Sequence, residues 1–167
     1  MNEGALPIEL RAATAADAAV ITALEQQIFV SDAWSAGQIA EELAAPYRSY
    51  FVAQHGGEVC GYAGVLVIGA EADVQTIAVA ESQRGRGIGA SLLRALNDAA
   101  VAQGATDMFL EVRVDNPAAI ALYQKFGFVR LGVRPKYYQP EGVDALIMRA
   151  LLPLAPVAAE GEENATA

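Results

Sequence analysis

Residues 81–93 read ESQRGRGIGASLL, and this stretch decides how the whole chain is interpreted. Three glycines lie within five positions, between an apolar strand-like run and an apolar helix-like run. Because glycine is costly to order on folding, a cluster of this density indicates a specific requirement. Backbone N–H groups on a tight loop that enters a helix bind anions, and Arg84 and Arg86 add charged donors. We therefore predict a phosphate-bearing ligand here, with a flexible surface turn as the alternative.

This stretch fits neither of two common nucleotide-binding motifs. A Walker loop requires Gly-Lys-Ser/Thr, which the stretch lacks. Gly85, Gly87 and Ala90 do match the dinucleotide fingerprint G-x-G-x-x-A, with Glu111 as the ribose-binding acid. However, the polar residues ESQR separate the strand from the glycines, and only 56 of the 167 residues follow Glu111. This is too short for the rest of a doubly wound sheet and a substrate domain, so we reject the dinucleotide interpretation.

The composition limits the class of protein. A chain of 167 residues fits one domain with a single substantial core. The formal net charge of −9 argues against nucleic-acid binding, which needs a basic surface, and suits a cationic partner such as an amine. The one cysteine, Cys60, excludes an internal disulfide and a multi-cysteine zinc site. We expect no metal cofactor.

Two further features concern location. The first ten residues, MNEGALPIEL, lack the charged and apolar regions of a signal peptide. The longest apolar run, residues 62–70, is far shorter than the roughly 18 residues that span a bilayer. We expect a cytoplasmic protein without membrane contact, present as a monomer or a weak dimer.

The predicted elements define a mixed sheet. Helix-capping pairs occur at Thr14 with Asp17, at Ser35 with Gln38, and at Asn116 before a proline. Strand-like patterns cover residues 7–13, 48–54, 58–68, 73–80, 108–114, 128–133 and 144–152. Short turns join most of these strands as antiparallel pairs, whereas the helix after the glycines requires one parallel pair. We predict an α/β fold with six to seven strands and about four helices on both faces.

With these elements and the glycine loop, the sequence resembles the Gcn5-related N-acetyltransferase (GNAT) superfamily, whose acyl-coenzyme A loop reads Gln/Arg-x-x-Gly-x-Gly/Ala. Arg84, Gly87 and Gly89 match that pattern. The strings TIAV, LEVRVDNPAAIALYQKFGF and RPKYYQPEGVDALIM are similar to the bacterial ribosomal-protein-alanine N-acetyltransferases, the RimI subfamily. The resemblance implies a GNAT domain over residues 1–152, followed by an acidic Ala/Glu-rich tail over residues 153–167 that we expect to be disordered.

The resemblance also implies an activity and a cosubstrate. The activity is acetyl transfer from acetyl-coenzyme A (acetyl-CoA) to the N-terminal amine, alanine for this subfamily, of a small-subunit ribosomal protein. Acetylation of lysine side chains or of a small amine, and a non-catalytic acetyl-CoA-binding domain, remain as alternatives. The cosubstrate would contact main-chain and side-chain groups of Ile77, Ala78, Val79, Arg84, Gly85, Arg86, Gly87, Ile88, Gly89, Ala90, Asn116 and Tyr123.

Acetyl transfer to an amine requires a proton acceptor for the amine and a proton donor for the departing thiolate. Glu111 interrupts an apolar strand and is the candidate base, directly or through a water; the alternative is a structural ion pair with Arg113. Tyr123 is the candidate acid, and it lies two helical turns after Asn116, on the same face. The alternatives are a core tyrosine and a helix-capping asparagine.

The resemblance places the substrate peptide beside Trp34, Glu111, Tyr137 and Tyr138, although ordinary packing would also explain the three aromatic residues. Asp144 either helps to bind the peptide or closes the last hairpin. The single histidine lies in a Gly-Gly turn and the single cysteine in an apolar strand, so we predict no role for either in nucleophilic catalysis.

Overall fold

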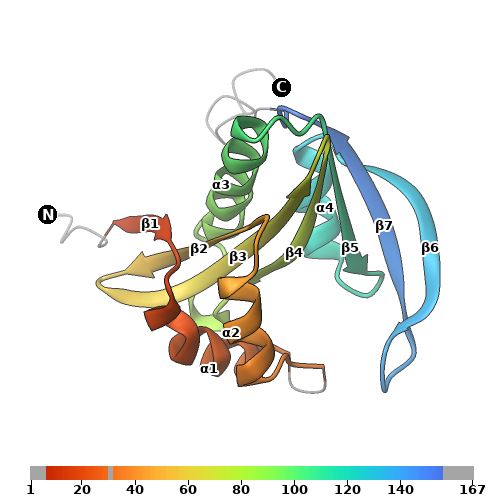
Figure 1. Cartoon of the computed structure of the whole chain (residues 1–167). Helices are drawn as coiled ribbons and strands as arrows, with labels where there is room; N and C mark the ends of the chain where they lie inside the picture. Colours follow the sequence, from red (N-terminus) through yellow and green to blue (C-terminus); the bar gives the residue numbers. More distant parts are fainter. Residues whose placement is uncertain (1–6, 30–31, 156–167) are drawn as a thin grey trace, which may run out of the picture.

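A seven-stranded mixed sheet, in the order β1-β2-β3-β4-β5-β7-β6, forms the centre of the molecule (Figure 1). The computed structural model describes residues 7–29 and 32–155. The strands are β1 (Ile8–Ala12), β2 (Arg48–His55), β3 (Glu58–Ile68), β4 (Glu71–Val79), β5 (Asp107–Arg113), β6 (Val129–Tyr138) and β7 (Val143–Leu151). The helices are α1 (Ala18–Ile28), α2 (Ala36–Ala44), α3 (Ile88–Ala102) and α4 (Pro117–Lys125), with 3-10 turns at Ala15–Asp17 and Glu81–Gln83. The predicted fold class is confirmed.

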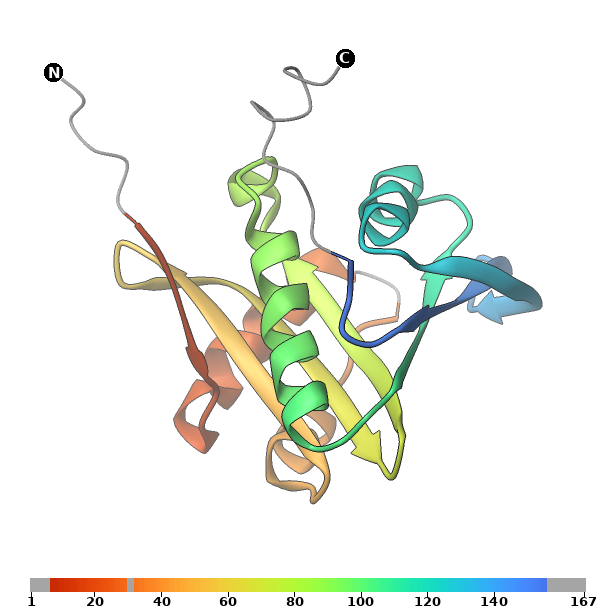
Figure 2. The same ribbon diagram turned by 90° about the horizontal axis from the view of Figure 1, so that it is seen from above.

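Different helices cover the two faces of the sheet (Figure 2). α3 packs on one face, where Leu92 and Leu96 are fully buried in the larger core cluster. α1 and α2 cover the other face, where Ile21 and Ile39 pack around the buried ring of Tyr62. Within the described part of the chain, no helix is long and apolar enough to cross a membrane.

The parallel pair β4–β5 is the feature that positions the site. α3 connects the two strands, as predicted, but their register includes only three residue pairs, the last between Asp73 and Phe109. Beyond this pair the strands continue to Val79 and Arg113 without pairing with each other, and they diverge (Figure 1). A β-bulge at Gln75 breaks the register of β4 with β3 at the same place. Because a bulge increases local twist, it turns β4 away from β5 and leaves a gap in the sheet.

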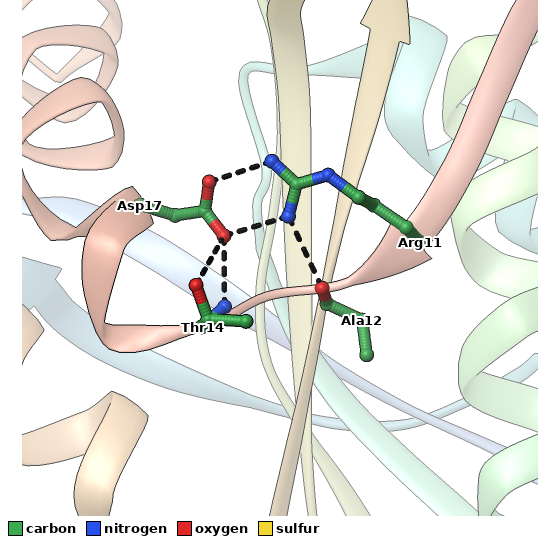
Figure 3. A network of polar contacts seen from close by, with 4 residues as sticks. All are labelled: Arg11, Ala12, Thr14 and Asp17. Carbon is green, nitrogen blue, oxygen red and sulfur yellow. Dashed lines mark hydrogen bonds and ion pairs between the residues drawn. The ribbon is translucent and has the colours of Figure 1, made fainter.

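A compact polar network fixes the start of α1 (Figure 3). Asp17 accepts the main-chain N–H of Thr14 at 2.8 Å, which is half of the predicted capping box. The guanidinium of Arg11, on β1, donates to both carboxylate oxygens of Asp17 at 2.8 and 2.7 Å. The Asp17 side chain is only 8% exposed, and these contacts lower its pKa to about 2. The network joins β1 to the helices that cover this face of the sheet.

Substitution of Asp17 by asparagine is expected to lower the free energy of unfolding at neutral pH by about 1–2 kcal/mol. The folded-state pKa is depressed from near 3.8 to about 2, so the stabilisation is present above pH 4 and is lost as the pH falls through 2. Chemical denaturation of both proteins at pH 7 and pH 2.5 measures the difference. An equal difference at the two pH values would contradict the ionic origin of the stabilisation.

The last described residues extend the domain slightly. The N–H of Leu154 donates to the side-chain oxygen of Asn97 on α3 at 2.9 Å, and the N–H of Ala155 donates to the carbonyl of Phe126 at 3.1 Å. These residues, which fall in the predicted tail, therefore pack on the domain. The remainder of that tail, residues 156–167, lies outside the described residues, and its expected disorder stays a prediction.

Candidate active site

A cavity fills the gap between β4 and β5, and six predicted site residues line it: Trp34, Ile77, Glu111, Asn116, Tyr123 and Tyr138. Of these, Ile77 lies on the diverging part of β4. A second cavity is lined by Tyr137 and shares Glu111, Trp34 and Tyr138 with the first. Residues that lie more than a hundred positions apart in the sequence, such as Trp34 and Tyr138, are thus brought to one place, where the facing edges of β4 and β5 do not pair with each other.

The glycine loop has the geometry of an anion-binding helix start. Gly85 and Gly87 adopt φ angles of +79° and +77°, which residues with a Cβ rarely tolerate. Gly87 is the N-cap of α3, and the N–H of Ser91 donates to its carbonyl at 3.0 Å. Among the described residues, no backbone carbonyl accepts the N–H groups of residues 85–90. Six donors at a helix N-terminus suit a phosphate group.

Gly89 lies in the first turn of α3 and faces α4, where a Cβ would lie 3.4 Å from the end of the Leu122 side chain. Arg84 lies just before the loop, and its Nε donates to the carbonyl of Val79 at 3.2 Å. This bond connects the end of β4 to the loop, while the rest of the guanidinium remains exposed. Along β4 itself, Val74 and residues 76–79 pair with β3 on one edge, and the other edge has no partner among the strands that the structure describes.

Glu111 lies on the face of β5 opposite to the buried side chains of Leu110 and Val112, as the alternating pattern predicts. Its side chain is 27% exposed. Arg134 of β6 forms an ion pair with it, with 2.9 Å between Nε and Oε1. The structural ion pair that the sequence offered as the alternative role of Glu111 is therefore present, but its partner is Arg134 and not Arg113, whose guanidinium contacts Asp115 and Asp32.

Tyr123 is buried, with its ring edge-to-face against Phe128 at 5.8 Å between centroids. In the part of the chain that the structure describes, its hydroxyl has no hydrogen-bond partner. Burial raises its pKa to about 12, so the phenol keeps its proton at physiological pH. Asn116 accepts the N–H of Ala119 at 3.2 Å and caps α4, and it also lines the cavity. Both expectations for this asparagine are therefore compatible with its position.

The aromatic pair Tyr137 and Tyr138 forms a wall of the site. The strand β6 is longer than the pattern predicted and includes both residues, whose rings pack edge-to-face at 5.0 Å. The Tyr137 hydroxyl hydrogen-bonds Glu111, which raises the pKa of Tyr137. The Arg113 guanidinium lies over the Tyr138 ring at 5.2 Å. Asp144 accepts the main-chain N–H of Lys136 at 2.9 Å, which supports its hairpin-closing role.

Glu25, which was not among the predicted site residues, also lines the cavity. It is only 3% exposed although it lies on α1. Its carboxylate accepts the Tyr62 hydroxyl and, at 2.9 Å, the main-chain N–H of Trp34. The sequence contains a feature that indicates burial of Glu25. The residue lies four positions after Ile21 and three before Ile28, on the apolar stripe of the helix.

The single histidine and cysteine take no part in the cavity. His55 Nδ1 lies 3.0 Å from the side-chain oxygen of Gln83, and the Cys60 thiol donates to the carbonyl of Ala53 at 3.5 Å. Burial raises the pKa of the Cys60 thiol, which disfavours the nucleophilic thiolate. In residues 7–29 and 32–155, no group of three His, Cys, Asp or Glu side chains is arranged to hold a metal ion.

The fold and the site define an acetyltransferase. The chain belongs to the acetyltransferase (GNAT) family, whose family model matches residues 19–128. Among its relatives, the N-alpha-acetyltransferase RimI of Mycobacterium tuberculosis is 45% identical over 148 residues, which cover 86% of this chain and 92% of the relative. The ribosomal protein bS18-alanine N-acetyltransferase of Escherichia coli is 34% identical over 117 residues, 69% of this chain and 78% of the relative. The predicted family and subfamily resemblance are confirmed.

Solved structures give the same result for the fold. The crystal structure of the ribosomal-protein-S18-alanine N-acetyltransferase from Escherichia coli superposes with a TM-score of 0.81 at 29% identity, covering 90% of this chain and 97% of that one. Arabidopsis thaliana NAA60 in complex with acetyl-CoA superposes with a TM-score of 0.79 at 16% identity, covering 87% of this chain and 99% of that one. The second comparison supports the fold alone.

Proposed function

We propose that this acetyltransferase transfers the acetyl group of acetyl-CoA to the α-amine of a protein N-terminus, and that its substrate is a small-subunit ribosomal protein beginning with alanine. The substrate class follows the names of the Mycobacterium tuberculosis, Bacillus subtilis and Escherichia coli relatives. A ribosomal-protein substrate would also agree with the predicted cytoplasmic location.

The residues present fit acetyl-CoA. The unpaired N–H groups of residues 85–90 and the guanidinium groups of Arg84 and Arg86 would hold its diphosphate. The free edge of β4 at residues 77–79 offers main-chain groups to its extended arm. When bound, acetyl-CoA supplies the acetyl group as a thioester. An N–H group of β4 near the carbonyl oxygen would stabilise the negative charge that develops there, an effect worth about 3 kcal/mol per donor in other systems.

Glu111 is the proposed proton acceptor for the amine. A protein α-amine has a pKa of about 7.7–8.0, so most of it is protonated at neutral pH and cannot attack a carbonyl. The carboxylate lies at the wall shared by both cavities, where Arg134 and Tyr137 fix its orientation. Tyr123 is the proposed donor to the sulfur. Its raised pKa keeps the phenol protonated, so a hydrogen-bond and proton donor is present when negative charge develops on the sulfur.

One observation carries this proposal. Glu111 is on the face of β5 away from the α3 core, whereas Tyr123 belongs to the core cluster on the α3 face. Two side chains on opposite faces of an intact sheet cannot serve one reaction. Here both line the same cavity because β4 and β5 stop pairing after Asp73 and Phe109. Acceptor and donor can therefore approach one acyl group from its two sides.

A peptide panel tests the proposed substrate. The purified protein and acetyl-CoA are incubated with peptides that begin with Ala, Ser or Met and with an amino-blocked peptide that contains lysine. Mass spectrometry is expected to find acetylation of the α-amine, fastest for alanine. Labelling of lysine only would overturn the N-terminal substrate, and binding of acetyl-CoA without turnover on any amine would favour a non-catalytic domain.

A further inference from the structure

A buried hydrogen-bond network lies along the part of the cavity wall that Glu25 and Trp34 form. Glu25 of α1 accepts the Tyr62 hydroxyl from β3 and the main-chain N–H of Trp34. The Tyr62 hydroxyl in turn hydrogen-bonds the side chain of Thr76, next to the bulge in β4. Glu25, Trp34 and Thr76 all line the cavity. The network therefore links the segment before α2 to the diverging strand.

The energetics of Glu25 indicate a role beyond packing. A buried carboxylate is expensive to desolvate unless it is paired and hydrogen-bonded. In the described part of the chain, no Lys, Arg or His side chain forms an ion pair with Glu25, so hydrogen bonds alone offset this cost. An apolar residue on this stripe would pack with Ile21 and Leu24 at a lower cost. What only the carboxylate provides is a bridge between two donors that lie nine and thirty-seven positions away.

We infer that Glu25 is a positioning residue, which holds Trp34 at the gap and thereby sets the affinity for the acceptor peptide. This inference rests on the proposed function. Trp34 lines both the cavity in the gap and the adjacent one that Glu111 and Tyr137 share. Within the residues that the structure describes, the hydrogen bonds of Glu25 go to Tyr62 and to the main chain of Trp34, and none goes to the glycine loop or to residues 77–79, where the acetyl-CoA groups are proposed to bind. We therefore expect a larger effect on peptide binding than on acetyl-CoA binding.

The test compares Glu25→Gln with the unaltered protein. A glutamine keeps the size of the side chain and an acceptor for the Trp34 N–H, but it presents an NH2 group to the Tyr62 hydroxyl. We expect the KM for the alanine peptide to rise about tenfold, with kcat and the Kd for acetyl-CoA changed by less than about threefold. Trp34 is the only tryptophan of the chain. Its fluorescence emission is expected to shift to longer wavelength and to become more sensitive to acrylamide.

Two further variants make the result specific. Tyr62→Phe removes the hydrogen bond between Tyr62 and Glu25 from its other end, so the double variant should lose little more peptide affinity than either single variant. If Glu25→Gln does not fold, Tyr62→Phe takes its place in the test. Asp17→Asn is the matched control. Asp17 is another buried carboxylate that accepts a main-chain N–H, but it lies at the opposite end of α1 and does not line the cavity. It should lower stability without changing the peptide KM or the Trp34 emission.

The outcomes are separable from the proposed function. Unchanged Trp34 fluorescence in both Glu25→Gln and Tyr62→Phe would overturn the positioning role, and so would a loss confined to kcat or to acetyl-CoA affinity. If the unaltered protein acetylates no peptide, the proposed function fails. The fluorescence comparison then still decides whether Glu25 positions Trp34, because it requires no turnover.

Discussion

Replacement of Tyr123 by phenylalanine is expected to lower kcat by about 10²–10⁴-fold, the usual range for loss of a general acid. The phenol is buried and un-ionised below about pH 12, so it is a proton donor across the working range. The ring, with its edge-to-face contact to Phe128, remains in the variant. Because the hydroxyl has no partner in residues 7–29 and 32–155, its removal leaves no polar group unpaired. Steady-state kinetics and a thermal melt measure the two effects.

The matched control for this variant is Tyr50→Phe. Tyr50 is equally buried, and its hydroxyl donates to Glu42 at 2.7 Å, outside the cavity in the gap. That control should keep full kcat, whereas Tyr123→Phe should keep full stability and an acetyl-CoA Kd within about twofold. A Tyr123→Phe protein with normal kcat would show that the thiolate receives its proton from another group.

Replacement of Glu111 by glutamine is expected to lower kcat/KM about 10²-fold at pH 7 and by much less above pH 9. At pH 7 only about a tenth of a peptide α-amine is deprotonated, so the reaction needs a proton acceptor. At high pH the amine is already free and the acceptor becomes dispensable. The glutamine retains the size of the side chain and an oxygen that can accept from Arg134. The variant therefore removes the proton acceptor and leaves the shape of the site unchanged.

A pH–rate profile from pH 6 to 9.5 provides the measurement. Asp107→Asn is the matched control, since Asp107 is on the same face of β5 and also pairs with an arginine, Arg149, at 2.8 Å. It lies at the end of β5 where the strand still pairs with β4, away from the cavity. Its profile should follow that of the unaltered protein. A loss for Glu111→Gln that is the same at every pH would assign Glu111 to positioning rather than to proton transfer.

Much of the fold was predictable because its signals are local. Asn116 and Pro117 define the start of α4 through the cap and the fixed proline φ angle, and both are found there. The two glycines of the His55–Glu58 hairpin adopt the positive φ angles that a two-residue turn demands. The alternation along β5 placed Glu111 on the correct face. Each of these inferences requires only residues within one or two turns of chain.

The partners of the site residues were not predictable in this way. Arg134 pairs with Glu111 across an intervening strand, β7, and the register of β6 with β7 shifts near this position. Arg113, which is near Glu111 in sequence, was the more obvious candidate and proved wrong. Glu25 finds its partner Tyr62 thirty-seven positions away, a contact that no periodicity reveals. These pairs depend on which strands lie side by side in the sheet and on how far a long side chain extends. Neither can be inferred from a local sequence pattern.

The short contact between β4 and β5 has a mechanical consequence. It divides the sheet into a four-stranded half and a three-stranded half that share a seam of only three residue pairs. The glycine loop follows β4, and Glu25 lies on α1, which packs on the four-stranded half. Glu111 lies on β5 of the three-stranded half, and Tyr123 lies on α4, which follows β5. The distances between the residues proposed for the reaction therefore depend on the angle between the two halves. Acetyl-CoA, bound in this gap as proposed, would contact both halves and add its binding energy to their junction.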